Sequence, residues 1–515
     1  MSEAPAKKNN LEFLNGVFNV LEKLGDALPT PFTLFFILFS ITAICSLIFG
    51  SMGASAVNPT SGETVTALNI FTKSGILWFL GSFVTNYTGY APLGLVLVMT
   101  LGIGMCEEMG LINTLIMKAM SKLPRALVPY MTIVIGLAGQ IASDSAQLVI
   151  PALTAAMYLG VGRHPVCGGL TGFCGTALGY IANPLITGTD ATAVGFTNAA
   201  IAELMPELAH MDSTNNYFFK LASTVFLGLA MGFVSDKICE PRFGPYVPKE
   251  GQSTDDTFVF TKEQNKGLSW AGIGALAYLC LIGYGLFSGF LLKDGVSFIG
   301  SPFLAYIIPE IFFLFMISGI AYGLGSGKIK GEADITKALV RRMGTLGSYL
   351  TMVFMSAQFI SLFNWSQMGT LLSINGANLL ADLGIGGYPL ILMFVLFIAM
   401  LDFLIGSASA KWAICAPIFV PMLALMGIHP AFVQVAYRVG DAAANIMSPT
   451  NAFLWMLLDT CKEKYDESTT IGTFLSNQFI YFVVSQVGWW IILFFWMQFN
   501  IPVGPGCPTV LPKIV

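Results

Sequence analysis

Residues 428–449, IHPAFVQVAYRVGDAAANIMSP, place an arginine and an aspartate in the middle of an otherwise apolar segment that ends at a proline. A second copy of this plan, RHPVCGGLTGFCGTALGYIANP, occupies residues 163–184. Identical residues recur at a constant offset of 265 positions, among them the pairs His164 and His429, Pro165 and Pro430, Gly175 and Gly440, and Pro184 and Pro449. The sequence therefore predicts two related halves.

The composition is that of an integral membrane protein. Of the 515 residues, 55% are hydrophobic and 10% are charged, and the mean hydropathy is +0.73. Soluble proteins carry about 25% charged residues, and apolar runs of the ~20 residues that cross a bilayer recur along this chain. The predicted spans are 31–52, 92–117, 165–205 (interrupted), 217–238, 268–292, 300–324, 345–366, 430–460 (interrupted) and 475–500.

Two longer apolar stretches, 127–160 and 387–427, carry serine-rich interruptions at their centres, ASDSAQ at 142–147 and GSASAK at 406–411. Each is long enough to enter and leave the membrane on the same side as a re-entrant hairpin. Irregular backbone at membrane depth is tolerated only inside protein or beside a water-filled cavity. We therefore expect an all-α polytopic membrane protein with nine transmembrane helices and two re-entrant hairpins.

The basic residues orient this layout. With the N-terminus in the cytoplasm, 19 of the 25 Lys and Arg residues lie on the cytoplasmic side, as the positive-inside rule requires. Nine spans then put the C-terminus outside, and the basic residues expected outside are Lys73, Lys220, Lys293 and Lys513. Because the two hairpins enter from opposite sides, the repeat has inverted topology, which indicates a secondary transporter with its site at the repeat interface.

This layout divides the chain into four parts. Residues 1–30 form a cytoplasmic amphipathic segment, and 31–238 form the first half, with spans 1–4 and the first hairpin. Residues 239–267 form a cytoplasmic linker, and 268–515 form the second half, with spans 5–9 and the second hairpin.

Several classes of protein are disfavoured by what the sequence lacks. It has no Walker A motif, so ATP-driven transport by this chain is not expected. Its nine cysteines form no C-x-x-C motif or Cys/His cluster, and no Ser/His, paired-Asp or zinc-ligand arrangement indicates an enzyme. The net charge of −4 is small. We expect no nucleic-acid partner and no cofactor, apart from a coupling ion, H⁺ or Na⁺.

Prolines interrupt the third and eighth spans, at Asn183-Pro184 and Ser448-Pro449. Proline removes a backbone donor and clashes with the preceding turn, and the freed carbonyls and half-helix ends can bind ions or substrate. The alternative is a proline kink satisfied by neighbouring hydroxyls. The repeat-related positions favour the functional interpretation, and the polar residues at the two breaks are Asn183, Thr187, Thr189, Asp190, Asn445, Ser448, Thr450 and Asn451.

The centres of the two hairpins carry short polar side chains, which are Ser143, Asp144, Ser145, Ser407 and Ser409. These can cap half-helices, and they can also present hydroxyls to substrate or ion; we expect both roles. Asp144 suits the first tip to a cation or proton, and Lys411 suits the second to an anion. Na⁺ at the tips and broken helices is therefore an open alternative to H⁺.

Arg438 and Asp441 are three residues apart and share one helix face. An arginine at bilayer depth costs about 2.5–3.5 kcal/mol on insertion scales, and arginine binds carboxylates through two parallel hydrogen bonds. We expect Arg438 to bind a substrate carboxylate and Asp441 to orient Arg438 or to move a proton. The alternative is an ion pair between the two that only makes the segment tolerable in the membrane.

Other candidate residues carry weaker signals. Trp412 could stack on an aromatic group of a substrate, although packing is the commoner role of a membrane tryptophan. For His164 and His429, helix capping is favoured over proton relay. The sequence assigns no role to the remaining acidic residues within or near spans, which are Glu107, Glu108, Glu310 and Asp402.

The segments ASDSAQLVIPA, NPLITGTDA, GSASAKWAICAP and HPAFVQVAYRVGDAAANIMSPTNAF together resemble the p-aminobenzoyl-glutamate transporter (AbgT) family over essentially the full chain. The resemblance implies a homodimeric secondary transporter of the bacterial inner membrane with nine spans and two opposed hairpins. It also implies that certain residues surround a central cavity, namely Asp190, Ser409, Trp412, Pro430, Arg438, Asp441 and Pro449.

The resemblance further implies one of two activities: import of p-aminobenzoyl-glutamate, or proton-driven efflux of sulfonamide antimetabolites. Both substrates contain a p-aminobenzene ring, and import would match a carboxylate to Arg438 and an aryl ring to Trp412. An ion channel is a third hypothesis, which the charged site and inverted repeat disfavour because channel filters usually form between subunits.

The candidate residues fall into two overlapping sets. Those expected to bind substrate are Ser145, Asn183, Asp190, Ser407, Ser409, Lys411, Trp412, Pro430, Arg438, Asp441, Asn445, Pro449 and Asn451. Those expected to couple transport to an ion are Ser143, Asp144, Thr187, Asp190, Asp441 and Ser448.

Overall fold

The computed structural model describes residues 29–57, 62–120, 123–142, 144–247, 260–295, 297, 301–448 and 451–511. The predicted amphipathic segment 1–30 therefore lies almost wholly outside the described residues. The first half of the chain contains α2 (Pro31–Met52), β1 (Ser55–Val57), β2 (Thr64–Thr66), α3 (Lys73–Thr88), α4 (Ala91–Met109), α5 (Leu111–Met120), α6 (Val128–Gly139), η1 (Gln140–Ala142), α7 (Asp144–Gly160), α8 (Pro165–Leu178), α9 (Gly188–Ile201), η2 (Pro206–Leu208), α10 (Tyr217–Val234), η3 (Ser235–Cys239) and α11 (Glu240–Phe243).

The second half is built from helices alone within the described residues. These are α12 (Lys262–Phe287), α13 (Pro302–Ala305), α14 (Ile307–Gly325), α15 (Glu332–Gly344), α16 (Gly347–Trp365), α17 (Met368–Asp382), α18 (Gly387–Asp402), α19 (Ala408–Leu425), α20 (Pro430–Asn445), α21 (Ala452–Lys464) and α22 (Ile471–Gln498). The predicted all-α polytopic fold is confirmed.

Seven helical runs among the described residues are long and apolar enough to cross a membrane, or eight if α15 and α16, which meet at a 50° bend, form one broken span. The count of nine spans and the re-entrant path of the hairpins stay predictions. α2 matches its predicted span at both ends, because Pro31 occupies the first helical turn and Gly53 ends the helix at φ 65°.

The structure differs from the sequence prediction at three places. The second span was predicted from residue 92 and α4 begins at Ala91, but the preceding helix α3 was not predicted and extends the apolar helical run back to Lys73. α3 was not predicted from hydropathy because its last turn, Thr85–Thr88, is polar. α17 and the β1–β2 hairpin were not predicted, and the predicted linker 239–267 is partly helical because α10 continues through the π-helical turn η3 into α11.

The repeat is visible in the order of elements. α6, α7, α8, α9 and α10 correspond to α18, α19, α20, α21 and α22, and in both copies a His-Pro pair begins the helix that precedes the break. α8 packs on α6 and α7, and α20 packs on α18 and α19. The two halves therefore share a packing plan.

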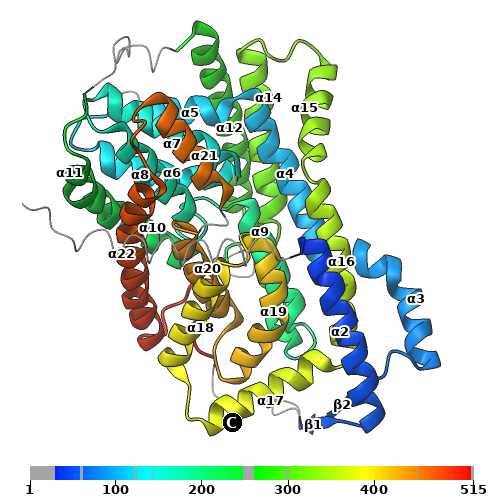
Figure 1. Cartoon of the computed structure of the whole chain (residues 1–515). Helices are drawn as coiled ribbons and strands as arrows, with labels where there is room; N and C mark the ends of the chain where they lie inside the picture. The colour runs from blue at the N-terminus through cyan, green and yellow to red at the C-terminus, as the bar shows by residue number, and fades with distance from the viewer. Residues whose placement is uncertain are drawn as a thin grey trace, which may run out of the picture.

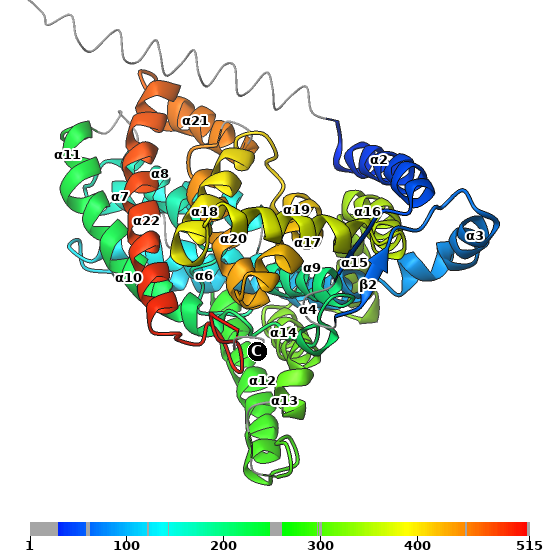
Figure 2. The ribbon, with the colours of Figure 1, turned by 90° about the horizontal axis from the view of Figure 1, so that it is seen from below.

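The elements gather around α20. Figure 1 places α2, α3 and α16 at one side of the molecule and α10, α11 and α22 at the other, with α18, α19 and α20 between them. Figure 2 gives the same arrangement from below, with α12 and α13 projecting from the body. Residues Pro430–Ala444 of α20 are all buried, so this helix lies at the centre of the protein.

Repeat-related glycines lie at close helix contacts in both halves. A Cβ atom on Gly175 of α8 would lie 3.0 Å from the Gly136 Cα of α6, and one on Gly440 of α20 would lie 2.5 Å from the Val395 carbonyl oxygen of α18. Backbones approach this closely only where a small residue leaves room.

The substitution Gly440→Ala is expected to destabilise the protein by about 1–3 kcal/mol, the usual cost of overpacking, because the new methyl group meets backbone. Thermal unfolding of the purified protein measures this. Gly272→Ala on α12 is the matched control, since a Cβ atom there meets nothing within 4 Å. Equal melting temperatures of the two variants would contradict the close contact.

Candidate functional site

The charged residues of α20 are completely buried. Arg438 and Asp441 are both 0% exposed. They do not pair with each other, so the alternative of an ion pair within the helix is wrong. Each instead binds charged side chains from other elements.

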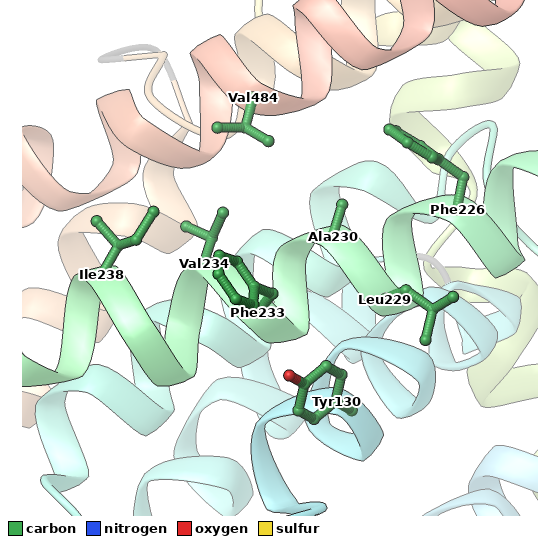
Figure 3. Close-up of a pocket in the computed structure, with 8 residues that line it drawn as sticks. All are labelled: Tyr130, Phe226, Leu229, Ala230, Phe233, Val234, Ile238 and Val484. Atoms are coloured by element: carbon green, nitrogen blue, oxygen red, sulfur yellow. The ribbon is translucent and has the colours of Figure 1, made fainter.

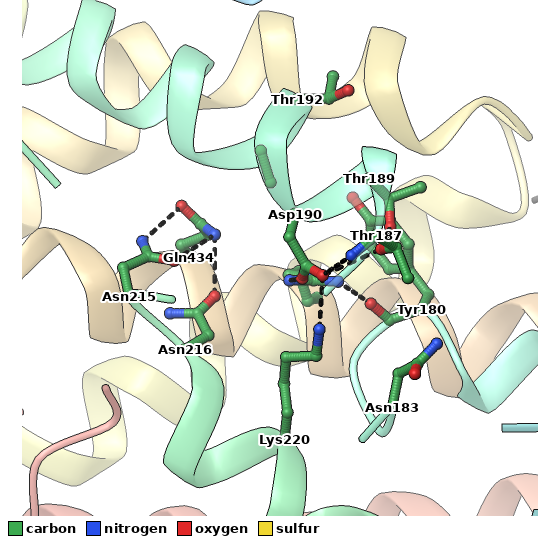
Figure 4. Close-up of polar contacts among 12 residues, drawn as sticks. Tyr180, Asn183, Thr187, Thr189, Asp190, Thr192, Asn215, Asn216, Lys220 and Gln434 are labelled. Atoms are coloured by element: carbon green, nitrogen blue, oxygen red, sulfur yellow. Dashed lines mark hydrogen bonds and ion pairs between the residues drawn. The ribbon is translucent and has the colours of Figure 1, made fainter. Parts of the chain in front are cut away.

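Arg438 belongs to a cluster that we call the α9 cluster, made of Asp190, Lys220 and Arg438. Asp190 Oδ1 lies 2.6 Å from Arg438 Nη1, and its Oδ2 lies 2.5 Å from Lys220 Nζ. The guanidinium also donates to the Tyr180 carbonyl and lies over the Tyr180 ring, 4.7 Å from its centroid. Figure 4 shows the ion pair of Asp190 with Lys220. One carboxylate between two cations gives this cluster a formal charge of +1.

Asp190 also caps the helix that carries it. The Thr187 N–H donates to Asp190 Oδ2 at 2.7 Å, and the Thr187 hydroxyl donates to the same oxygen at 3.0 Å. This capping box satisfies a backbone donor at the start of α9. The break after α8 therefore ends at a helix whose first turn depends on the charged cluster.

Asp441 belongs to a second cluster, the α19 cluster, made of Asp402, Lys411 and Asp441. Lys411 Nζ lies 2.7 Å from Asp441 Oδ1 and also donates to Asp402 Oδ1. The Tyr437 hydroxyl lies 3.2 Å from Asp441 Oδ1 and donates to the Ala408 carbonyl at 2.6 Å. One ammonium between two carboxylates gives this cluster a formal charge of −1.

The two clusters compensate each other. Their six charged groups sum to zero, and Arg438 and Asp441, one turn apart on α20, connect them. A buried charge without a partner costs several kcal/mol, so each cation here is held by carboxylates of a different element. Neither Arg438 nor Lys411 presents an exposed charge to a ligand in this arrangement.

Trp412 is also enclosed. Its ring stacks on Tyr437 with centroids 4.3 Å apart, and its indole N–H donates to the Ala193 carbonyl and the Thr197 hydroxyl, each at 3.1 Å. Thr197 in turn donates to Gln434 at 2.6 Å, and Gln434 bonds Asn215 and Asn216 (Figure 4). This buried amide network joins α9, α20 and the segment before α10.

A cavity of about 990 Å³ lies where the two hairpin centres meet the start of α9. Ser145 of α7 and Ser407 and Ser409 at the start of α19 line it, together with Thr189 and Thr192, which flank Asp190. The structure thus brings together the predicted serines of both hairpins. The two charged clusters lie directly behind this wall, within two residues of lining residues along α9 and α19.

The remaining predicted residues have local partners. Asn451 Nδ2 donates to Asn445 at 2.5 Å and to Gln147 of the first hairpin at 3.1 Å, and the Ser448 hydroxyl donates to the Asp402 carbonyl at 3.1 Å. Asn183 accepts from the Leu185 N–H at 2.8 Å. Pro430 is buried as the first residue of α20. Ser143, Pro449 and Thr450 lie outside the described residues, and of Asp144 the structure describes only the backbone.

His429 serves as a helix cap. Its Nδ1 accepts a hydrogen bond from the Ala431 N–H at 3.1 Å. Burial lowers the pKa of His429 to about 4, so the ring is neutral at physiological pH and its nitrogen remains an acceptor. This supports capping over proton relay at this position.

Two cluster residues were missed from the sequence. Lys220, for which only a place on the outer side of the membrane was predicted, is 1% exposed and pairs with Asp190, because a buried ammonium requires a carboxylate partner. Asp402 had no assigned role, although its position nine residues before Lys411 put both at the interruption of one hairpin. Intramembrane position was the available signal for each.

Other sites are less suited to a polar ligand. A groove of about 590 Å³ lies between α6, α10 and α22, and apart from the Tyr130 hydroxyl its described lining is apolar (Figure 3). The described residues contain no group of three or more His, Cys, Asp or Glu side chains that could hold a metal ion. The cavity at the hairpin centres is therefore the candidate site.

A repeat of broken helices, seven helical runs among the described residues that are long and apolar enough to cross a membrane, and a polar cavity beside the breaks are together typical of a multi-pass membrane transporter. The sequence profile described as "AbgT putative transporter family" matches residues 16–511. The chain belongs to the AbgT transporter family.

Characterised relatives cover nearly the full length. The chain is 33% identical over 493 residues to the p-aminobenzoyl-glutamate transport protein of Escherichia coli K12, which covers 95% of this chain and 96% of the relative. The YdaH transporter of Alcanivorax borkumensis matches with a TM-score of 0.88 and 30% identity, over 93% of this chain and 100% of that one. MtrF of Neisseria gonorrhoeae, described with a class of antimetabolite efflux pumps, matches with a TM-score of 0.88 and 34% identity, over 96% and 100%.

The α19 cluster predicts an ordered series of stabilities. Lys411→Met leaves two buried carboxylates without a cation and is expected to cost about 3–5 kcal/mol, the usual effect of removing one member of a buried pair. Asp402→Asn leaves Lys411 paired with Asp441 and should cost less. Thermal unfolding of the two variants in the same detergent gives the order, and a more stable Lys411→Met variant would argue against the cluster.

Proposed function

We propose that this chain is an ion-coupled secondary transporter of p-aminobenzoyl-glutamate or a similar aromatic carboxylate, working by alternating access. It is a homodimer in the bacterial inner membrane, with its N-terminus in the cytoplasm and its C-terminus outside. The observation that carries the proposal is the cavity of about 990 Å³ that the serines of both hairpin centres line together with α9 and the α15–α16 bend. Its size suits a small molecule, and the Escherichia coli relative that matches 95% of this chain is named for this substrate.

The coupling ion is a proton carried by the α19 cluster. The six buried charges are neutral together, so a substrate carboxylate that enters the adjacent cavity adds an uncompensated negative charge. Protonation of Asp402 or Asp441, which share the single ammonium of Lys411, offsets one such negative charge. Like charges held close together at low dielectric favour such a shared proton. Na⁺ is the competing ion.

Uptake into proteoliposomes tests the function and the ion together. Labelled p-aminobenzoyl-glutamate is expected to accumulate when an inward proton gradient is imposed, and an inward sodium gradient alone should have no effect. Accumulation driven only by sodium would overturn proton coupling, and no saturable uptake under either gradient would overturn the proposed substrate.

Asp402→Asn is expected to separate exchange from accumulation. The variant removes one proton site but keeps Lys411 paired with Asp441, so counterflow of labelled against unlabelled substrate should persist. Accumulation driven by the proton gradient should fall to the level seen without a gradient. Wild-type accumulation in this variant would exclude Asp402 from coupling.

A second candidate is efflux of sulfonamide antimetabolites, which the 34% identical MtrF structure favours by its description. Cells that express the chain would then hold less labelled sulfonamide than cells that do not. Equal sulfonamide content would count against efflux without affecting the uptake proposal.

A further inference from the structure

Arg342 is the one charged side chain among the described residues that line the cavity. It lies in the last turn of α15, two residues before the helix ends at Gly344 and close to the 50° bend that joins α15 to α16. Arg342 was not among the predicted site residues, because it lies in a basic stretch expected on the cytoplasmic side.

Arg342 is held against α4. Its Nη2 forms an ion pair with Glu107, and a Cβ atom on Gly104 would lie 2.2 Å from its Cγ, so the glycine leaves room for the arginine stem. Figure 1 shows α15 beside α4, and the two helices are in contact. The carboxylate of Glu107 thus positions the guanidinium, and Gly104 leaves the space that the arginine side chain occupies.

The guanidinium retains capacity to bind a ligand. Its ion pair with Glu107 uses Nη2, the side chain lines the cavity, and a guanidinium offers five donors in a planar fork that matches a carboxylate. The side chain is 20% exposed. Arg438 and Lys411, by contrast, are 0% exposed and are bound to carboxylates of the protein.

We propose that Arg342 binds the substrate carboxylate in the cavity, and that Glu107 holds the guanidinium in place and competes with the substrate for it. This inference rests on the proposed function, because it assigns the anion contact of the same cavity. The hydroxyls of Ser145, Ser407 and Ser409 then face the uncharged part of the substrate across the cavity.

The neighbouring residues provide a matched control. Arg341 pairs with Glu108 at 3.0 Å between the same two helices, but Arg341 is 73% exposed and does not line the cavity. The two ion pairs have the same chemistry and differ in their access to the cavity. The variants Arg341→Gln and Glu108→Gln therefore serve as controls. They make the same change in charge and break an equivalent ion pair between the same two helices, but away from the cavity.

The test measures the apparent KM for labelled p-aminobenzoyl-glutamate in proteoliposomes. Arg342→Gln is expected to raise KM about tenfold or more, the usual effect of losing a hydrogen bond to a charged group. Glu107→Gln is expected to lower KM, because the competing carboxylate is gone. Arg341→Gln and Glu108→Gln should match the wild type. A merely structural ion pair would make Arg342→Gln and Glu107→Gln change KM in the same direction, which would overturn the proposal.

A neutral analogue isolates the carboxylate. The diamide of p-aminobenzoyl-glutamate should compete for uptake equally well in the wild type and in Arg342→Gln, since it offers no anion. An equal loss for acid and diamide would overturn the proposal. If Arg342→Gln fails to fold, the direction of the KM change in Glu107→Gln decides the question.

Failure of the proposed function is distinguishable. It would appear as absence of uptake in the wild type, whatever Arg342 does. Calorimetric binding of p-aminobenzoyl-glutamate to the purified protein then tests Arg342 separately: binding that is lost in Arg342→Gln supports the contact, and binding unchanged in that variant, or absent from the wild type, overturns it.

Discussion

The structure depends on neutralising two charges that α20 carries into the centre of the protein. Arg438 and Asp441 are fully buried, and a buried charge is tolerated only when paired. Arg438 takes its partner from the first half of the chain, Asp190, and Asp441 takes its partner, Lys411, from the second. α20 therefore forms ion pairs with both halves of the chain. These two ion pairs also constrain the position of α9, which carries Asp190, relative to α19, which carries Lys411.

The two repeats share a backbone plan but differ in their charges. At the positions of Arg438 and Asp441, α8 carries Phe173 and Thr176, and both are buried without charged partners. The glycines at the helix contacts are nevertheless common to both copies, Gly175 and Gly440. The scaffold therefore does not require the charges of α20. Because α20 carries them and α8 does not, both clusters lie next to the side of the cavity that α9 and α19 form.

Much of the fold could be predicted from the sequence because hydropathy, proline and the repeat act locally. The bounds of α2 and the break between α20 and α21 follow from such signals, and so do the serines that meet at the cavity. Partners distant in the chain could not be predicted, since nothing local relates Lys220 to Asp190 or Asp402 to Asp441. The substrate-binding role of Arg438 was predicted from its insertion cost, its carboxylate-binding chemistry and the family resemblance, and these signals could not reveal that Asp190 is its partner in the structure.

Asp190 performs two tasks with one carboxylate, since it closes the first turn of α9 and neutralises Arg438 and Lys220. The helix–coil equilibrium of that turn is consequently tied to the ionic contacts of Asp190. Thr189 and Thr192, which line the cavity, belong to the same turn and the next. A change that separates Lys220 and Arg438 from Asp190 therefore also destabilises the first turn of α9. Because Thr189 and Thr192 line the cavity from that part of α9, local unfolding there links the charge of the buried clusters to the shape of the cavity.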